Sequence, residues 1–474
     1  MPQAANHVDV KAAGATGNGK AFDTKAIQAA IDACAKQGGG TIAFRPGVYL
    51  CAPLRLASNI TLNLQAGAVL LGSPDIEDRV LDGWPAGMFY AKRARNVTIT
   101  GRGTIDGNYR HFFHMKRVIP ATYYRDFDPK RVRGGKGFAG RSVDGPVEPK
   151  KRPGNMLVFS ECENVLVEGV TITGSTMWTV HVADSRGVTF RDLDLTSDQK
   201  CYNNDGIHLT DCKNVVISGC RITTGDDCIA MSGQKGQAKH RLEAGSEPEI
   251  ALGFSGLRGA SENVVVSDCV LSSKSSAVRI WSLQTPVRHV RLSNLIVRNT
   301  NRGIGIFLRS EESISDVTIS GVELETRYHT GAWWGWAEPL HISAMPLPGK
   351  RLERGRIERI RVFDLSATAE NGMVFFSHLP GVIRDISMEN IRLLIKTGKH
   401  SALKAGHLDL RNTLVELGIT QRMGTGLTAV NVDSLSARNV HIQYDKPFPP
   451  HMAPGPQLDG VRDLSISDFR ERYL

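Results

Sequence analysis

The sequence lacks the long apolar runs that mark membrane spans and secretory leaders. No stretch of 18 apolar residues occurs, so we expect no membrane-spanning helix. Residues 1–6 show no apolar segment typical of a signal peptide. A chain whose leader had been removed would begin in the same way, so export from the cytoplasm stays open.

Metal-binding cysteine pairs and nucleic-acid-binding motifs are also missing. The eight cysteines include no Cys-x-x-Cys pair, and we expect buried free thiols, with a single disulfide left open. The formal charge of +10 and the pI of about 9.2 predict an anionic partner: nucleic acid, anionic lipid or an acidic polysaccharide. Since no RNA-binding motif or zinc-finger spacing occurs, we expect no nucleic acid partner.

Helical periodicity is scarce and falls in one early segment. Between Thr24 and Lys36 apolar residues recur at helical spacing, and three glycines at 38–40 follow. The remaining sequence has the short alternating patterns of strands. We predict one helix over residues 24–36 that covers the end of a β structure, because an uncovered end would expose core and strand edges.

A four-residue phrase, Asn-(Val/Ile)-x-(Ile/Val/Leu), recurs along the chain, and several successive copies lie 23–27 residues apart. Copies or close variants begin at Asn59, Asn96, Asn164, Gly187, Asn214, Asn263, His289 and Asp316. Short strands at this period, without helices between them, predict an all-β parallel β-helix that forms a single domain over residues 1–474. The asparagines are expected to take left-handed backbone conformations and to stack as ladders.

Three segments interrupt the repeat: residues 108–155, which are basic and aromatic, residues 233–258 and residues 325–350. Insertions in a solenoid form loops, often around the binding face. We therefore expect these segments to surround a cleft, with 108–155 and 325–350 narrowing it toward a pocket.

Three aspartates stand before two short apolar-alternating runs. Asp205 lies in Asn203-Asn204-Asp205-Gly206, and Asp226 and Asp227 follow Gly225. Asp226 follows Asp205 at an offset of 21 residues, which is about one solenoid turn, and strands of successive turns lie about 4.8 Å apart. The sequence therefore predicts that the three carboxyl groups meet on one face.

Strand alternation separates inward from outward side chains near these acids. It predicts an outward column of His181, His208, Ala230, Arg279, Phe307 and His341. The small residues Gly206 and Ala230 leave room for a ligand beside the acids.

Crowded carboxyl groups cannot all ionise easily, so one keeps its proton to higher pH. A general acid then stands beside a general base, which is the pair that glycoside hydrolysis needs. Three carboxylates also suit calcium, so these residues by themselves leave a calcium site open.

Several motifs resemble those of the polygalacturonase family, glycoside hydrolase family 28. They are Asp23-Thr24-Lys25-Ala26-Ile27, Gly38-Gly39-Gly40-Thr41, Arg152-Pro153, Gly174-Ser175-Thr176-Met177-Trp178, Asn203-Asn204-Asp205-Gly206 and Gly225-Asp226-Asp227. The resemblance implies a right-handed parallel β-helix that hydrolyses galacturonan-type bonds with inversion. It also implies that Asp226 is the general acid and that Asp205 and Asp227 hold the water. We expect no metal and no cofactor.

The residues of the family pattern that bind the sugar are altered in this sequence. The family's Gly-His-Gly segment corresponds to Lys274-Ser275-Ser276-Ala277, and its Arg-Ile-Lys falls near Gly305-Ile306-Phe307. Other cations nearby are therefore expected to bind a substrate carboxylate, which arginine does bidentately. The predicted substrate-binding residues are His181, Asn203, His208, Lys274, Arg279, Arg309, Trp333, Trp334 and His341.

Two readings stay open for the tryptophans, which form either a sugar-stacking wall or a packed loop anchor. Glu338 in the same segment is a further candidate carboxylate. The sequence thus predicts a glycoside hydrolase for an acidic or pectic polysaccharide or oligosaccharide, located extracellularly or in the periplasm, with the cytoplasm left open. A calcium-dependent polysaccharide lyase with Arg279 as base and a non-catalytic carbohydrate-binding solenoid are the alternatives. The oligomeric state is not predicted.

Overall fold

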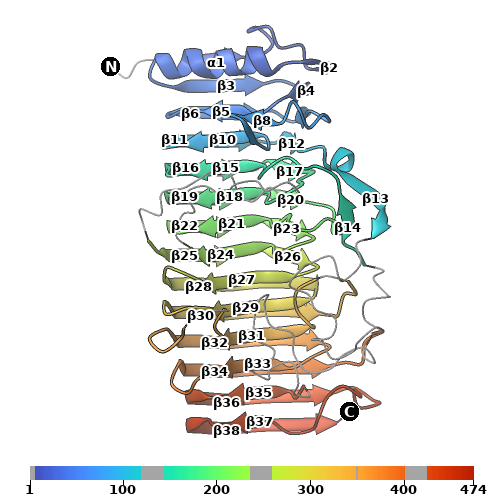
Figure 1. Ribbon diagram of the computed structural model, residues 1–474, viewed down its shortest axis with the longest axis vertical. Helices are drawn as coiled ribbons and strands as arrows, with labels where there is room; N and C mark the ends of the chain where they lie inside the picture. Colours follow the sequence, from blue (N-terminus) through green and yellow to red (C-terminus); the bar gives the residue numbers. More distant parts are fainter. Residues whose placement is uncertain are drawn as a thin grey trace.

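Coils of short strands stack along one axis, as the ribbon of the computed structural model shows (Figure 1). The structure describes residues 6–118, 144–234, 259–331, 333–347, 351–400 and 424–473. Neighbouring coils pair through parallel strands in two large sheets, which enclose one continuous apolar core. The predicted parallel β-helix is therefore confirmed.

One sheet of twelve parallel strands carries the candidate site, and we call it the 12-stranded sheet. Its strands are β5 (Leu54–Leu56), β10 (Phe89–Lys92), β15 (Leu157–Ser160), β18 (Val180–Ala183), β21 (Ile207–Thr210), β24 (Ile229–Gly233), β27 (Ser276–Ser282), β29 (Arg302–Leu308), β31 (Glu338–Ala344), β33 (Met373–Ser377), β35 (Leu427–Val430) and β37 (Gln457–Asp459).

The other large sheet has 22 strands, which begin as two rows. The first row is β1 (His7–Asp9), β3 (Gly40–Phe44), β6 (Ile60–Leu64), β11 (Arg95–Gly101), β16 (Glu163–Glu168), β19 (Arg186–Arg191), β22 (Lys213–Ser218) and β25 (Ser261–Ser267). The second row is β2 (Asn18–Phe22), β4 (Gly47–Cys51), β7 (Ala68–Gly72), β12 (Thr104–Asp106), β17 (Thr171–Thr173), β20 (Asp194–Thr196), β23 (Arg221–Thr224) and β26 (Val270–Ser273). From β28 onward single long strands continue both rows: β28 (Val287–Thr300), β30 (Ser313–Thr326), β32 (Arg356–Ala369), β34 (Ile383–Ile395), β36 (Val432–Tyr444) and β38 (Arg462–Tyr473).

The recurring phrase marks the turn near the start of strands in the first row of the 22-stranded sheet and of the long strands β28 and β30 that continue it. Its first residue has a positive φ, between 55° and 66°, in all eight copies named above. Asparagine tolerates this left-handed conformation because its short side chain bonds locally. The amide of Asn96 donates to Asn59 (2.7 Å), and that of Asn164 donates to Asn96 (3.1 Å), so the predicted ladder is also confirmed.

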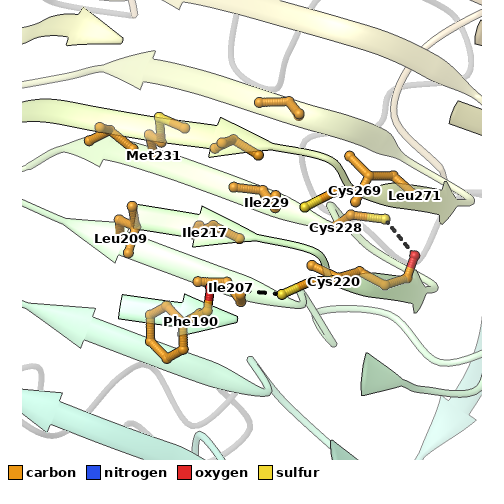
Figure 2. Packing of buried hydrophobic residues seen from close by; sticks show 14 of the residues in the cluster. Phe190, Ile207, Leu209, Ile217, Cys220, Cys228, Ile229, Met231, Cys269 and Leu271 are labelled. Carbon is orange, nitrogen blue, oxygen red and sulfur yellow. Dashed lines mark hydrogen bonds between the residues drawn. The ribbon is translucent and has the colours of Figure 1, made fainter. Parts of the chain in front are cut away.

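Inward side chains of the strands fill the core directly behind the acids. Ile207, Leu209, Ile229 and Met231 all point into this core (Figure 2). All eight cysteines are buried and free, which confirms the prediction. Burial raises the pKa of the Cys228 thiol to about 12.

The helix α1 (Thr24–Lys36) lies across the N-terminal end of the stack (Figure 1). Its apolar face buries Ile27, Ala30, Ile31 and Cys34 against the first coils. The chain leaves the helix through Gly38, whose φ is +91°, a conformation that favours glycine. The predicted covering helix is confirmed, and no described helix has the length and apolar character needed to cross a bilayer.

The insertions are described only in part. Within 108–155 the chain forms the 3₁₀ helix η1 (Tyr109–Phe112) and the antiparallel pair β13 (Phe113–Val118) and β14 (Val147–Pro149), whereas residues 119–143 lie outside the described ranges. Most of 233–258 also lies outside them. In the third segment, β30 continues to Thr326 and β31 begins at Glu338, so strands occupy part of the range predicted as a loop. A short antiparallel pair, β8 (Val80–Leu81) and β9 (Trp84–Pro85), also lies among the described residues.

Candidate active site

The three aspartates meet where two neighbouring coils enter the 12-stranded sheet. Strands β21 and β24 pair in register, Ile207 with Ile229, so Asp205 and Asp227 take equivalent places on successive coils. The backbone N–H of Gly206 donates to the Asp227 carbonyl over 2.9 Å and fixes this alignment. All three side chains are buried: Asp205 and Asp227 are 2% exposed, and Asp226 is 6% exposed.

Backbone and amide groups hold the Asp226 loop. The Asp226 carboxylate accepts the N–H of Asn203 (3.2 Å) and that of Asp227 (3.0 Å). The side-chain oxygen of Asn204 accepts the N–H groups of Gly225 (2.9 Å) and Asp226 (3.0 Å). Asn204 is a site residue that was missing from the predicted set, although it stands inside the motif that pointed to Asp205.

Two glycines permit the close approach of these coils. A Cβ at Gly225 would overlap the carbonyl oxygen of Cys201, and one at Gly206 would overlap that of Cys228. Both clashes involve backbone atoms, which cannot swing aside as a flexible side chain would. The glycines of the two motifs are thus explained by packing around the acids.

Arg279 on β27 bridges the two equivalent acids. Its Nε donates to Asp227 Oδ2 in a short hydrogen bond, and its Nη2 lies 3.5 Å from Asp205 Oδ2. The other Asp227 oxygen accepts the backbone N–H of Ser276 over 3.0 Å. Burial by itself lowers the pKa of Arg279, but the Asp227 and Asp205 carboxylates outweigh it, so the pKa is raised.

Two histidines of the predicted column lie beside the acids. His208 Nδ1 is 3.0 Å from Asp205 Oδ2, and its ring stacks on Trp178 with 3.5 Å between ring centres. His181 Nδ1 lies 3.2 Å from the Asn155 amide nitrogen. Burial lowers the pKa of both histidines well below the usual value, so both rings are neutral at pH 7. Trp178 is a half-buried neighbour that the predicted set lacked.

The predicted column is wrong at Phe307. The strand register pairs Arg279 with Gly305, and it pairs Phe307 with Trp281, one position further along the outward side. The Phe307 ring lies over Gly305, in the place that a Cβ at Gly305 would need. The column also differs from a solvated strand face, since His181, His208, Arg279 and His341 are all buried.

Lys274 follows a residue that contacts the Asp226 loop. The neighbouring Ser273 hydroxyl donates to the Asp226 carbonyl over 2.6 Å. The Lys274 ammonium lies 3.1 Å from His329 Nδ1 and 3.9 Å from Asp144 Oδ1. Burial is the main cause that lowers the pKa of Lys274, and burial next to Lys274 lowers that of His329 to about 3. The neutral His329 ring therefore accepts a hydrogen bond from the ammonium.

Asn203 joins the acid loop to an arginine of the insertion. Asn203 is half-buried, and its side-chain oxygen accepts a hydrogen bond from Arg152 Nη2 over 3.4 Å. The Arg152 guanidinium also lies 4.5 Å from the centre of the Tyr202 ring. Arg152 was part of a motif that carried the resemblance, but nothing in its spacing indicated this contact.

The other predicted residues lie in buried contacts further along the stack. Arg309 donates to the Ser343 carbonyl over 3.4 Å, and its guanidinium lies 5.1 Å from the Phe307 ring centre. His341 Nδ1 lies 3.4 Å from Glu338 Oε1, and Glu338 also accepts the N–H of Trp336 over 2.7 Å. Glu338 is thus occupied by protein groups.

Trp333 is buried in a cluster of aromatic and apolar residues, and Trp334 is 9% exposed. That cluster contains Phe112, Phe113, Val147, Cys201, Tyr202, Tyr328, Trp333, Trp336 and Ala337. For Trp333 the burial favours the packed anchor over the sugar-stacking wall. Among the described residues, no group of three or more His, Cys, Asp or Glu side chains has an arrangement suited to a metal ion.

Comparison with known proteins places this geometry in a family. An exopolygalacturonase of Zea mays is 27% identical over 301 residues, which are 61% of this chain and 66% of the maize protein. A third of the maize protein is therefore unmatched. The solved structure of a family 28 exopolygalacturonase from Yersinia enterocolitica superposes with a TM-score of 0.61 at 17% identity. It covers 99% of this chain and 78% of that one.

The structure of a hyperthermoactive exopolygalacturonase from Thermotoga maritima gives a TM-score of 0.56 at 24% identity, over 83% of this chain and 88% of that one. The sequence model of the family described as glycosyl hydrolases family 28 matches residues 69–326, which include the three aspartates and Arg279. The chain is a right-handed parallel β-helix that belongs to glycosyl hydrolases family 28.

Proposed function

We propose that this protein hydrolyses O-glycosidic bonds in an acidic, pectic polysaccharide, by general acid/base catalysis with inversion. The observation that carries the proposal is the pairing of Asp205 with Asp227 on successive coils, with Asp226 directly beside them. The names of the relatives, exopolygalacturonase and polygalacturonase, support the same chemistry.

The roles follow from what each carboxyl group contacts. Asp205 and Asp227 face one cation, Arg279. The two carboxylates together act as the general base, which holds a water and deprotonates it. Asp226 is the general acid, which gives its proton to the leaving glycosidic oxygen. Water then attacks the anomeric carbon from the opposite side of the sugar, so the configuration inverts.

Lys274 is the residue that we propose for binding a substrate carboxylate. Its ammonium has a neutral acceptor in His329 and lies 3.9 Å from Asp144, and its three donors leave one for a substrate carboxylate. The low exposure of the three acids favours a pocket over an open groove, and thus release of sugars from a chain end. A pectic substrate also implies that the protein works outside the cytoplasm.

Turnover of defined pectic oligosaccharides tests the proposal. The purified chain is incubated with acidic and neutral oligosaccharides, and new reducing ends are counted beside the Asp226→Asn variant. We expect a loss of about 10³-fold or more for Asp226→Asn, and no loss for Asp194→Asn, an exposed acid on β20.

Three outcomes separate this proposal from its alternatives. New reducing ends with inverted configuration support hydrolysis. An ultraviolet-absorbing unsaturated product that a chelator abolishes overturns it in favour of a lyase. Binding without turnover, unchanged by Asp226→Asn, overturns it in favour of a carbohydrate-binding solenoid.

A further inference from the structure

We infer that Arg279 is a positioning residue that clamps Asp205 and Asp227 side by side, so that the two carboxylates act as one base. This inference rests on the proposed function, and it assigns Arg279 a role other than the substrate binding predicted from sequence.

The route of the Arg279 side chain supports this role. On the outward column the strand register gives His208, Ala230, Arg279 and Gly305 on four successive coils. Asp205 stands before the first of these strands, so the guanidinium must pass over Ala230 to reach it. Ala230 is fully buried and carries only a methyl group, which leaves this path open.

The opposite direction is closed. The Phe307 ring covers Gly305, the neighbour of Arg279 on the following coil. The Arg302 guanidinium lies 4.9 Å from the Phe307 ring centre, and its Nε lies 3.7 Å from Glu338 Oε2. Aromatic and charged groups thus fill this side, and Arg279 can extend only toward the acids, with its guanidinium 5.3 Å from the Trp281 ring centre.

The charges around Arg279 explain why the clamp matters. The titratable groups that face it are Asp205 and His208 of one coil and Asp226 and Asp227 of the next, and the buried His208 is neutral. Two buried carboxylates with no cation would be costly, and one would take up a proton. Arg279 lies between them and contacts both carboxylates, so one cation holds them side by side, where both can bind the same water.

Asp226 is a further negative charge that faces Arg279, and backbone groups hold its carboxylate. Its carboxylate is bonded to the backbone N–H groups of Asn203 and Asp227. Asp205 and Asp227 are held by Arg279, so Asp226 is the remaining carboxyl of the cluster and takes the role of proton donor. The clamp therefore sets the division of roles, which the sequence had suggested from mutual repulsion alone.

The same contacts weigh against Arg279 as the base of a lyase. A base must lose its proton before it accepts one from the substrate. The Asp227 and Asp205 carboxylates outweigh burial and raise the pKa of Arg279, so deprotonation is harder here than in water.

The test compares Arg279→Gln, Arg279→Lys and Ala230→Leu in the full chain, with Arg291→Gln on β28 as the matched control. For Arg279→Gln we expect kcat to fall about 100-fold, KM to change less than threefold, and the acidic limb of the kcat/KM profile to move to higher pH. Arg279→Lys restores part of kcat. Ala230→Leu, which keeps Arg279 but blocks its path, shifts the same limb.

A rise in KM with kcat and the pH profile unchanged would overturn the clamp and return Arg279 to substrate binding. A second readout needs no activity: the melting temperature of Arg279→Gln relative to wild type. We expect the deficit to be larger at pH 7 than at pH 4, since at pH 4 the unpaired carboxylates take up protons. An equal deficit at both pH values overturns the inference. If wild type cleaves no substrate, the proposed function fails while this melting comparison still decides the role of Arg279.

Discussion

His208 and Asp205 form a buried hydrogen-bonded pair, with Nδ1 of the ring 3.0 Å from Oδ2 of the carboxylate. Burial holds the pKa of His208 well below its usual value, so the ring carries one proton. The carboxylate only accepts hydrogen bonds, which places that proton on Nδ1. Nε2 then accepts from the Ser232 hydroxyl, 2.9 Å away. His208 and Arg279 thus both approach the Oδ2 oxygen of Asp205, and His208 helps to orient that carboxylate.

Replacing His208 by phenylalanine removes this hydrogen bond and keeps an aromatic ring against Trp178. We expect kcat to fall at least about tenfold, because Asp205 loses the donor that fixes its rotamer. His441→Phe, on the distant β36, is the control and leaves kcat unchanged. A His208→Phe protein with wild-type kcat would show that the pair is not needed to orient Asp205.

Acid should destabilise the fold through its buried histidines. Burial lowers the pKa values of His181 and His208, and it lowers that of His329 to about 3. Below pH 6.5 these histidines bind protons in the unfolded chain but stay neutral in the folded protein. Their contribution to the free energy of unfolding is therefore complete above that pH and is lost as the pH falls. For His329 the loss at pH 5 is about 2 kcal/mol.

Urea unfolding at pH 7.5 and pH 5 measures this loss. His329→Gln should show a smaller drop between the two pH values than wild type does. A drop of equal size in both proteins would mean that His329 takes up its proton in the folded state.

The repeat and the acid cluster were predictable because both depend on spacing. Each phrase begins with a residue that takes a positive φ, and this local requirement recurs from Asn59 to Asp316. Register then carries Asp205 and Asp227 to equivalent places. Any parallel solenoid with this period would bring them together.

What sequence could not give depends on side-chain reach and on register after irregular stretches. Arg279 contacts Asp205 two coils away, over Ala230, and no alternation pattern records such a contact. Phe307 was placed one position wrongly, because Gly305 carries no side chain and the neighbouring ring fills its place. Arg152 contacts Asn203, and Lys274 contacts His329. One residue of each pair lies in an inserted segment, and the repeat does not predict the path of such a segment.

Substitution of Trp333 distinguishes a role in packing from a role in sugar binding. It is buried in the aromatic cluster that includes Phe112 and Tyr202. Trp333→Ala should lower the free energy of unfolding by about 3–5 kcal/mol, as the loss of a buried aromatic ring does. Activity that survives at low temperature should keep its KM. A raised KM with unchanged stability would restore the sugar-stacking wall.

The number of reactive thiols can be measured without a substrate, and it tests whether all eight cysteines are free. All are buried and free, and burial raises the pKa of the Cys228 and Cys212 thiols to about 12. A thiol reagent reacts with the thiolate, so we expect no reaction with the native protein and eight thiols in denaturant without a reductant. Six thiols or fewer after unfolding would reveal a disulfide.

Gly225 joins the packing of the coils to the placement of the acids. A side chain there meets the Cys201 carbonyl, and the loop that would have to move carries Asp226 and Asp227. Gly225→Ala should therefore lower kcat by about tenfold or more, even where the protein still folds, because small displacements of catalytic groups are costly. Gly259→Ala is the control: its Cβ meets no atom within 4 Å, and its φ of +62° adds only local backbone strain. Circular dichroism and kcat of both variants, measured at one temperature, decide the matter. If Gly225→Ala lost stability alone while kcat held, the glycine would serve the stacking of the coils and not the acids. The expected result ties the two together, because the N–H groups of Gly225 and Asp226 both donate to the side-chain oxygen of Asn204, which holds them as one turn.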